Sequence, residues 1–344
     1  MGLFFLLLTI LPPTGGAADT SARIDLKLDT AEAEAVLLVV EKTAAGQPVT
    51  EADWQRIFSS EPYARLKERE VSLRRELTDD GFRKFLLSGE TVARATDLRR
   101  TLGAWKGADL DAAARRILPY LPPEARIQAK VYPVIKPQSN SFVFEAGTNP
   151  AIFLYVDPAK SQEEFENTVA HELHHIGLAS LDSAYEARIR SLPDNARAAA
   201  TWMGAFGEGL AVLAAAGSTD VHPLGVFPLE DRVRWDQDMK YIDRLMDPLD
   251  QFFGDVVAGG FCKPEIADHV AFTFFGYRGP WYTVGYRMAA AVEKRFGRPV
   301  LLECMADPRL LLKKYNEAAA AHNVAAKEKW AMWSTELLKA VGVE

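Results

Sequence analysis

The sequence predicts an α+β protein that is predominantly helical and contains one small antiparallel sheet. Helical patterns occupy the chain from about Leu26 to Leu121 and again from about Leu229 onward. Three short runs between these regions are rich in Val, Ile, Phe and Tyr and are separated by turn residues, which is typical of strands. The runs are Ile127 to Ile135, Ser141 to Ala146 and Ala151 to Val156.

The N-terminal helical region carries no motif for chemistry. Thr50 to Asp53 is a capping-box start, and Arg65 to Leu77 mixes charges of both signs around spaced apolar residues, as in a solvated amphipathic helix. Near the end of the chain, Ala325 to Val341 has Trp and Leu residues at helical spacing. That spacing favours core packing over a cofactor site.

A helix directly after the sheet carries the strongest motif. Ser161 is suited to cap it, and Phe165, Val169 and Leu173 recur every four residues along one face. We therefore expect residues 161 to 178 to be helical, with the sheet beside this helix.

His171, Glu172 and His175 form an H-E-x-x-H pattern on that helix. Residues four apart share a helix face, so both imidazoles can bind a single Zn²⁺, and Glu172 sits beside the open coordination position. His174 points about 100° away from its neighbour, which indicates a supporting or surface residue rather than a ligand.

Glu208 is the best candidate for a third ligand. It stands between Gly207 and Gly209 in a segment that is otherwise apolar. A lone carboxylate is costly to bury there, and glycines weaken a helix unless something must approach closely. Metal ligation explains both features. The alternative is that Glu208 marks a helix end with its charge in solvent.

These residues resemble the gluzincin metallopeptidases, in which H-E-x-x-H is followed by a Glu on a later helix. The string Pro280 to Ala289 is similar to one in a set of bacterial zinc-dependent peptidases, and its Tyr-x-x-Gly start is similar to that of the aminopeptidase N relatives. The resemblance covers roughly residues 128 to 300. It implies a zincin-like fold, one zinc held by His171, His175 and Glu208, Glu172 as general base, and Tyr282 as the group that steadies the tetrahedral intermediate.

The sequence therefore predicts a zinc metallopeptidase that cleaves a peptide or protein substrate with a zinc-activated water. Ser141 to Gly147 is a candidate edge strand for binding an extended peptide, or else a simple structural hairpin. His222 and His269 are weaker candidates than Tyr282 for stabilising an oxyanion. Two other functions stay open: a zinc hydrolase of a non-peptide amide or ester, and a non-catalytic envelope protein with structural zinc. Endopeptidase and exopeptidase action are both open.

The N-terminal sequence indicates export to the periplasm or the extracellular space. Gly2 to Ile10 is an apolar run, and Gly16 to Ala18 is a small-residue cleavage site ahead of Asp19. No stable membrane span is expected once this segment is removed, although retention as an anchor is the alternative. Cys262 and Cys304 could pair in an oxidising compartment or remain free thiols.

Charge argues against nucleic-acid binding, because the net charge is −7 and no basic stripe is present. The expected organisation has four parts: a signal peptide (1–18), an N-terminal helical region (19–126), a catalytic core with the sheet and both ligand helices (127–216), and a C-terminal helical region that completes the active site (217–344).

Overall fold

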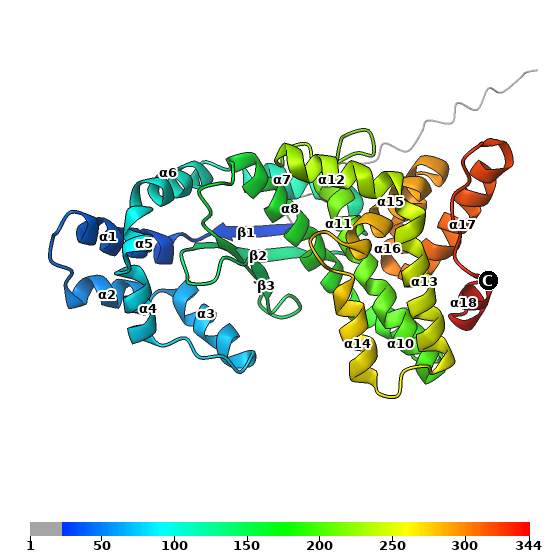
Figure 1. Ribbon diagram of the computed structural model, residues 1–344, viewed down its shortest axis with the longest axis horizontal. Helices are drawn as coiled ribbons and strands as arrows, with labels where there is room; N and C mark the ends of the chain where they lie inside the picture. Colours follow the sequence, from blue (N-terminus) through cyan, green and yellow to red (C-terminus); the bar gives the residue numbers. More distant parts are fainter. Residues whose placement is uncertain (1–22) are drawn as a thin grey trace, which may run out of the picture.

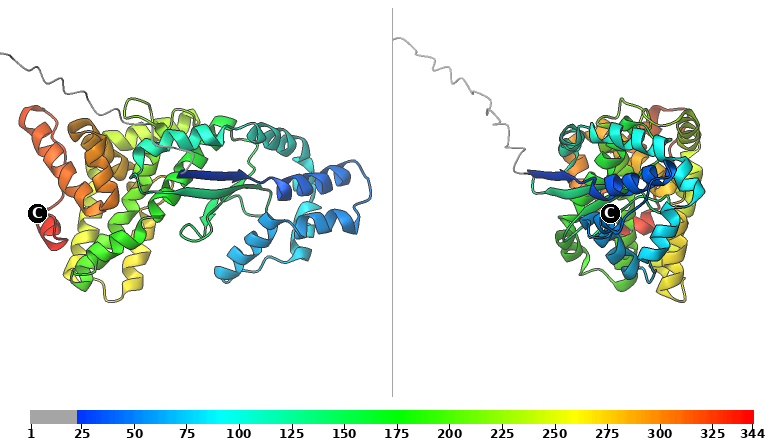
Figure 2. Two further views of the ribbon diagram at one scale, coloured as in Figure 1. Left: turned by 180° about the vertical axis from the view of Figure 1, so that it is seen from behind. Right: turned by 90° about the vertical axis from the view of Figure 1, so that its left-hand side faces the viewer.

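The computed structural model of the protein describes residues 23–344, so the expected signal peptide lies outside the described residues. The α+β class is confirmed, since helices predominate around one four-stranded sheet in the described part (Figure 1). The N-terminal helices lie at one end of an elongated molecule, the sheet lies in the middle, and the C-terminal helices lie at the other end. Figure 2 shows the same arrangement from behind.

The sheet is mixed, so the prediction of an antiparallel sheet was wrong. Its strand order is β1 (Ile24–Leu28), β2 (Ile127–Val134), β4 (Ala151–Tyr155) and β3 (Phe142–Phe144). β1 pairs with β2 and β2 with β4 in parallel, and only β3 and β4 are antiparallel. Successive predicted runs do reverse direction. However, β4 lies between β2 and β3, and two reversals make β4 run the same way as β2.

β1 corrects the expectation that only helices occur from Leu26 to Leu121. Its residues Ile24, Leu26 and Leu28 pack against the main core, and the polar Asp25 and Lys27 alternate with them. This period of two is the pattern of a half-buried strand. It is only five residues long, and its partner β2 follows about a hundred residues later.

Seven helices separate β1 from β2, and the predicted capping box at Thr50 and Asp53 is present at the start of the second of them. One face of the sheet packs its Tyr132 and Phe153 against Leu66 of α3. The seven helices are α1 (Ala31–Ala44), α2 (Glu51–Phe58), α3 (Glu61–Ser72), α4 (Asp79–Leu86), α5 (Gly89–Ala93), α6 (Ala95–Lys106) and α7 (Leu110–Ile117).

The opposite face of the sheet packs on the main hydrophobic core, which extends from α1 to the C-terminus. A short 3₁₀ turn, η2 (Leu118–Tyr120), leads from α7 toward β2, and another, η3 (Gly204–Phe206), precedes α11. The helices after the sheet are α8 (Gln162–Ala179), α9 (Asp182–Ile189), α10 (Asp194–Met203), α11 (Gly207–Ala216), α12 (Leu229–Lys240), α13 (Ile242–Ala258), α14 (Pro264–Thr273), α15 (Pro280–Phe296), α16 (Arg298–Ala306), α17 (Pro308–Ala325) and α18 (Thr335–Ala340).

The predicted helix from Ala325 to Val341 is limited to α18. Residues 326–334 are not helical. Asn323 accepts a hydrogen bond from the Trp330 backbone N–H at 2.8 Å, and Asn316 accepts one from the Trp333 N–H at 2.9 Å. These two amides of α17 satisfy backbone groups that a helix would otherwise pair.

Within residues 23–344, the stretch Asp194–Ala216 is long and apolar enough to cross a membrane by length and composition alone. Of its apolar window, 67% is buried inside the protein, as in the core helix of a folded domain. The two cysteines are free, with Cys304 buried and Cys262 exposed.

Candidate metal centre

The helix α8 forms as its sequence predicts. Ser161 caps it, and the Ser161 and Glu164 side chains complete a capping box. Phe165 and Leu173 are buried on the core side. This anchoring fixes the rotation of α8 about its axis, and therefore the direction in which the opposite face points.

The other face of α8 brings His171 and His175 together. Their Nε2 atoms are 3.1 Å apart. Glu208, the second residue of α11, places its Oε2 atom 3.1 Å from His171 Nε2 and 3.2 Å from His175 Nε2. The predicted three residues therefore converge on one point.

This cluster fits a zinc ion. Each of the three side chains offers one ligand atom, and all three atoms lie within 4.8 Å of one another. Zinc bonds of about 2.0–2.1 Å in a tetrahedral arrangement place neighbouring ligand atoms roughly 3.3 Å apart, close to the separations found here. Two imidazoles and a carboxylate also form a donor set that zinc commonly takes, with a fourth position left open.

The three side chains are partly accessible, with 15%, 27% and 18% of His171, His175 and Glu208 exposed. Burial would raise the pKa of Glu208, but the two histidines outweigh burial and hold this pKa well below its ordinary value. Burial lowers the pKa of His175, whereas the Glu208 charge and hydrogen bond raise it, and the result is about 9. Glu208 is therefore ionised, and its negative charge lies beside the two imidazoles. Its charge does not lie in open solvent, contrary to the alternative reading.

Gly209 and Gly285 allow α11 and α15 to cross with their backbones in contact. A Cβ atom on Gly209 would lie 2.0 Å from the Tyr286 backbone nitrogen, and one on Gly285 would lie 2.7 Å from the Phe206 carbonyl oxygen. A Cβ on Gly207 would meet nothing within 4 Å. Of the two glycines beside Glu208, only Gly209 is therefore in close contact with another part of the chain. This contact is with helix α15, and not with a metal as the sequence had suggested.

This crossing places Tyr282, in the first turn of α15, beside the histidines. Its ring stacks on that of His171, with centroids 6.1 Å apart and planes at 13°. Burial, followed by the charges of Glu208 and Glu172, raises the pKa of Tyr282. The phenol therefore stays protonated and can donate a hydrogen bond. Glu172 is half-buried, and its charge also acts on His175.

His174 is fully buried, which excludes the surface role left open for it. Its Nε2 atom is 3.1 Å from the carbonyl oxygen of Tyr120, and burial lowers its pKa to about 3. The Tyr120 hydroxyl lies 3.2 Å from Glu293 of α15 and accepts a hydrogen bond from Arg298 at 2.7 Å. Tyr120 thus links the ligand helix α8 to α15. No motif in the sequence identifies this tyrosine.

The other two histidines considered for the oxyanion lie elsewhere. His222 contacts Asp236 at 3.1 Å and accepts a hydrogen bond from the Leu224 backbone N–H at 3.0 Å. His269 is exposed on α14. Neither belongs to the metal-binding group found among residues 23–344.

One comparison with known proteins gives a match. The sequence model of the family described as "Putative zinc dependent peptidase (DUF5700)" matches residues 54–324, which contain every residue of the centre described above. No curated protein and no solved structure matches the chain significantly.

Proposed function

The chain belongs to this family of zinc-dependent peptidases, and on that premise we propose that it hydrolyses peptide bonds at a gluzincin-type centre formed by His171, His175 and Glu208. The observation that carries the proposal is the convergence of two Nε2 atoms and one carboxylate oxygen within hydrogen-bonding distance of one another. One zinc ion per chain is expected there.

A bound zinc ion would supply Lewis acidity, which polarises a scissile carbonyl and lowers the pKa of a water molecule. Glu172 is the proposed general base: it takes a proton from the attacking water and passes it to the leaving amine. Tyr282 donates a hydrogen bond to the carbonyl oxygen as negative charge develops on it. Its protonated phenol and its position against His171 support this role.

An extended peptide segment is the proposed substrate, bound along the outer edge of β3. β3 is the last strand in the sheet order, so one side of it has no strand neighbour in the described sheet. Ser141, just before β3, and Thr168, one turn before His171 on α8, line the same small cavity. A peptide added to this edge would therefore pass close to the ligand helix.

Export completes the proposal. A signal peptide over residues 1–18 with cleavage before Asp19 would release the mature chain to the periplasm or the extracellular space. N-terminal sequencing of protein recovered from its native host checks this, and an intact Met1 in the cytoplasmic fraction would overturn it.

Glu172→Gln tests the catalytic proposal. The amide keeps the shape of the side chain but cannot take the proton, so the variant is expected to retain zinc and lose hydrolysis. The matched control is Glu163→Gln, an exposed position in the first turn of the same helix, which should keep full activity.

The assay is product sequencing from a mixed peptide library, with and without a chelator, and with zinc added back. A fully active Glu172→Gln variant would remove Glu172 as the base. Turnover of amides or esters without peptides would support the non-peptide hydrolase, and no turnover of any of them would support a non-catalytic zinc protein.

A further inference from the structure

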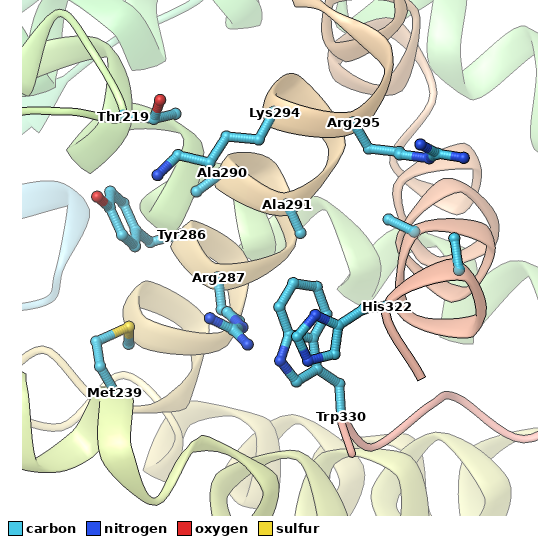
Figure 3. A pocket seen from close by; sticks show the side chains of 12 residues that line it. Thr219, Met239, Tyr286, Arg287, Ala290, Ala291, Lys294, Arg295, His322 and Trp330 are labelled. Atoms are coloured by element: carbon cyan, nitrogen blue, oxygen red, sulfur yellow. The ribbon is translucent and has the colours of Figure 1, made fainter. Parts of the chain in front are cut away.

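A second cavity lies on another side of the helix that carries Tyr282. It has a volume of about 580 Å³ and opens between α15 and α17, with Met239 of α12, Thr219 and Trp330 on its remaining sides (Figure 3). Cavities that bind small molecules typically span about 300–1,000 Å³. This one is therefore large enough for an organic ligand.

The cavity is separate from the metal centre although both use α15. Arg287, Ala291 and Lys294 line it. On a helix of 3.6 residues per turn these three positions lie about 120° to 180° around the axis from Tyr282, whereas Tyr286, which also lines the cavity, lies one turn after Tyr282. None of the lining residues is a proposed zinc ligand. A ligand in the cavity would therefore not touch the proposed zinc ligands.

The lining of the cavity is positively charged in a chain of net charge −7. Arg287, Lys294 and Arg295 all line it, and no carboxylate residue does. The nearby carboxylates of α15 and α17 are engaged elsewhere, because Glu293 pairs with Arg298, and Glu317 pairs with Lys314. Among residues 23–344 no carboxylate lies within ion-pair distance of the three lining cations. An anion would therefore meet cations that are not already ion-paired.

Arg287 is the most constrained of these cations. Its guanidinium lies 3.9 Å from the centroid of the Trp330 ring, and Trp330 also stacks on His322 at 3.9 Å. Its Nε atom is buried and has no hydrogen-bond partner among the described residues. A guanidinium fixed in this way is already ordered, which reduces the entropy cost of pairing it with an anionic group.

The rest of the lining is apolar and small. Ala290 and Ala291 of α15 face Ala318 and Ala321 of α17, and Met239 closes one side. Because these four side chains are single methyl groups, they leave the cavity unfilled. They also provide an apolar surface that favours the apolar part of a ligand. The core packing expected for Trp330 and its neighbours is confirmed, since Trp333 and Leu337 are buried and Trp330 packs against the core. Trp330 also lines this cavity.

We propose that this cavity binds a small organic anion in which one carboxylate or phosphate group is joined to an apolar or aromatic body. The anionic group lies against Arg287 and Lys294, and the body lies against the alanines. The site requires neither zinc nor catalysis.

Calorimetric titration of the full chain with three naphthalene probes tests the proposal. Naphthalene-2-carboxylate and 2-naphthyl phosphate carry the two candidate anionic groups. Naphthalene-2-carboxamide has the same ring system without a charge and serves as the neutral control. At least one anion is expected to bind at least tenfold more tightly than the amide, and the better anion identifies the preferred group. Equal affinity for all three probes, or no binding of either anion, would overturn the proposal.

Two variants locate the binding, and each has a matched control. Arg287→Gln should weaken anion binding at least tenfold, whereas Arg190→Gln, which removes an exposed charge outside the cavity, should not. Ala321→Trp should block the cavity from an exposed position. Ala320→Trp, the exposed neighbour outside the lining, should leave binding intact.

Because Ala321 is exposed, its variant tests the site even if Arg287→Gln fails to fold. Anion binding that survives Ala321→Trp, or that disappears when the zinc is chelated, would place the anion elsewhere and contradict the proposal.

Discussion

Tyr282 is the residue whose contribution depends most on its exact surroundings. Its ring lies parallel to that of His171, and burial together with the charges of Glu208 and Glu172 raises the pKa of its hydroxyl group. These conditions favour a neutral phenol that donates a hydrogen bond. A hydrogen bond of this kind lowers the activation barrier only if it strengthens as the carbonyl oxygen becomes negative.

Tyr282→Phe is therefore expected to lower kcat by about a hundredfold to a thousandfold, with little change in KM or zinc content. Tyr286→Phe is the control, since Tyr286 lies one turn further along α15 and packs against Trp235. Steady-state kinetics on both variants measures the effect. If Tyr282→Phe stays within a few fold of the parent, the tyrosine serves only for packing.

Glu32 predicts a pH dependence of stability that is independent of the metal centre. It is fully buried at the start of α1, and its Oε2 atom accepts a hydrogen bond from the Ile135 backbone N–H at 3.2 Å. Burial raises its pKa from 4.5 to about 8, against the hydrogen bond and the nearby charge of Lys136. The folded state therefore holds this proton more tightly than the unfolded state does. The stabilisation is complete below about pH 4.5 and is lost as the pH rises through about 8.

Glu32→Gln should flatten this dependence, because the amide has no proton to lose. The free energy of unfolding of the variant, relative to the parent, is expected to rise between pH 5 and pH 8. Denaturant unfolding across that range measures it, with Glu68→Gln, an exposed position on α3, as the control. A constant difference between variant and parent across the range would show that Glu32 does not change its protonation state in this window.

The residues of the candidate metal centre could be predicted to different extents. His171 and His175 follow from spacing, because a helix alone determines that residues four apart share a face. Glu208 follows from the cost of burying a lone carboxylate. Tyr120 could not be predicted, since it meets His174 through a backbone carbonyl, which carries no residue-specific signal.

Among the elements, the crossing of α11 and α15 is what brings Glu208 and Tyr282 to the histidines. The two helices touch at Gly209 and Gly285. A side chain on Gly209 would overlap the backbone of α15, and one on Gly285 would overlap the backbone of the 3₁₀ turn η3. The position of the site in the fold therefore depends on two residues without side chains.

Gly209→Ala should consequently destabilise the protein by about 1–3 kcal/mol, as overpacking typically does, and should weaken zinc binding by moving Glu208. Gly207→Ala is a matched control, because it changes the same helix by the same methyl group in open space. Thermal unfolding and metal titration measure both. Equal behaviour of the two variants would mean that the close contact at Gly209 is not needed to position the ligand.

Most of the helices and three of the four strands could be predicted, but α9, α10 and the order of the strands could not. β2, β3 and β4 each have a composition that indicates a strand, and their limits agree with the predicted runs to within two residues. The insertion of β4 between β2 and β3, and the pairing of β1 with β2, are tertiary contacts. A local sequence pattern does not specify which strands will pair with each other in the sheet.

At the scale of the whole molecule, the candidate centre is assembled from three parts of the chain. α8 follows the sheet directly, α11 comes about thirty residues later, and α15 contributes Tyr282 from the C-terminal region. The buried core that includes all three extends from α1 to the C-terminal residues. Metal binding at this centre should therefore stabilise the folded state of the chain.

Metal content per chain tests the central claim most directly. Elemental analysis of the purified parent is expected to give one zinc per chain, and Glu208→Ala should lose it or hold it far more weakly, because only two ligands remain. Glu265→Ala, at an exposed position in the first turn of α14, should keep the parental content. If Glu208→Ala binds zinc as tightly as the parent, the third ligand lies elsewhere and the account of this centre is contradicted.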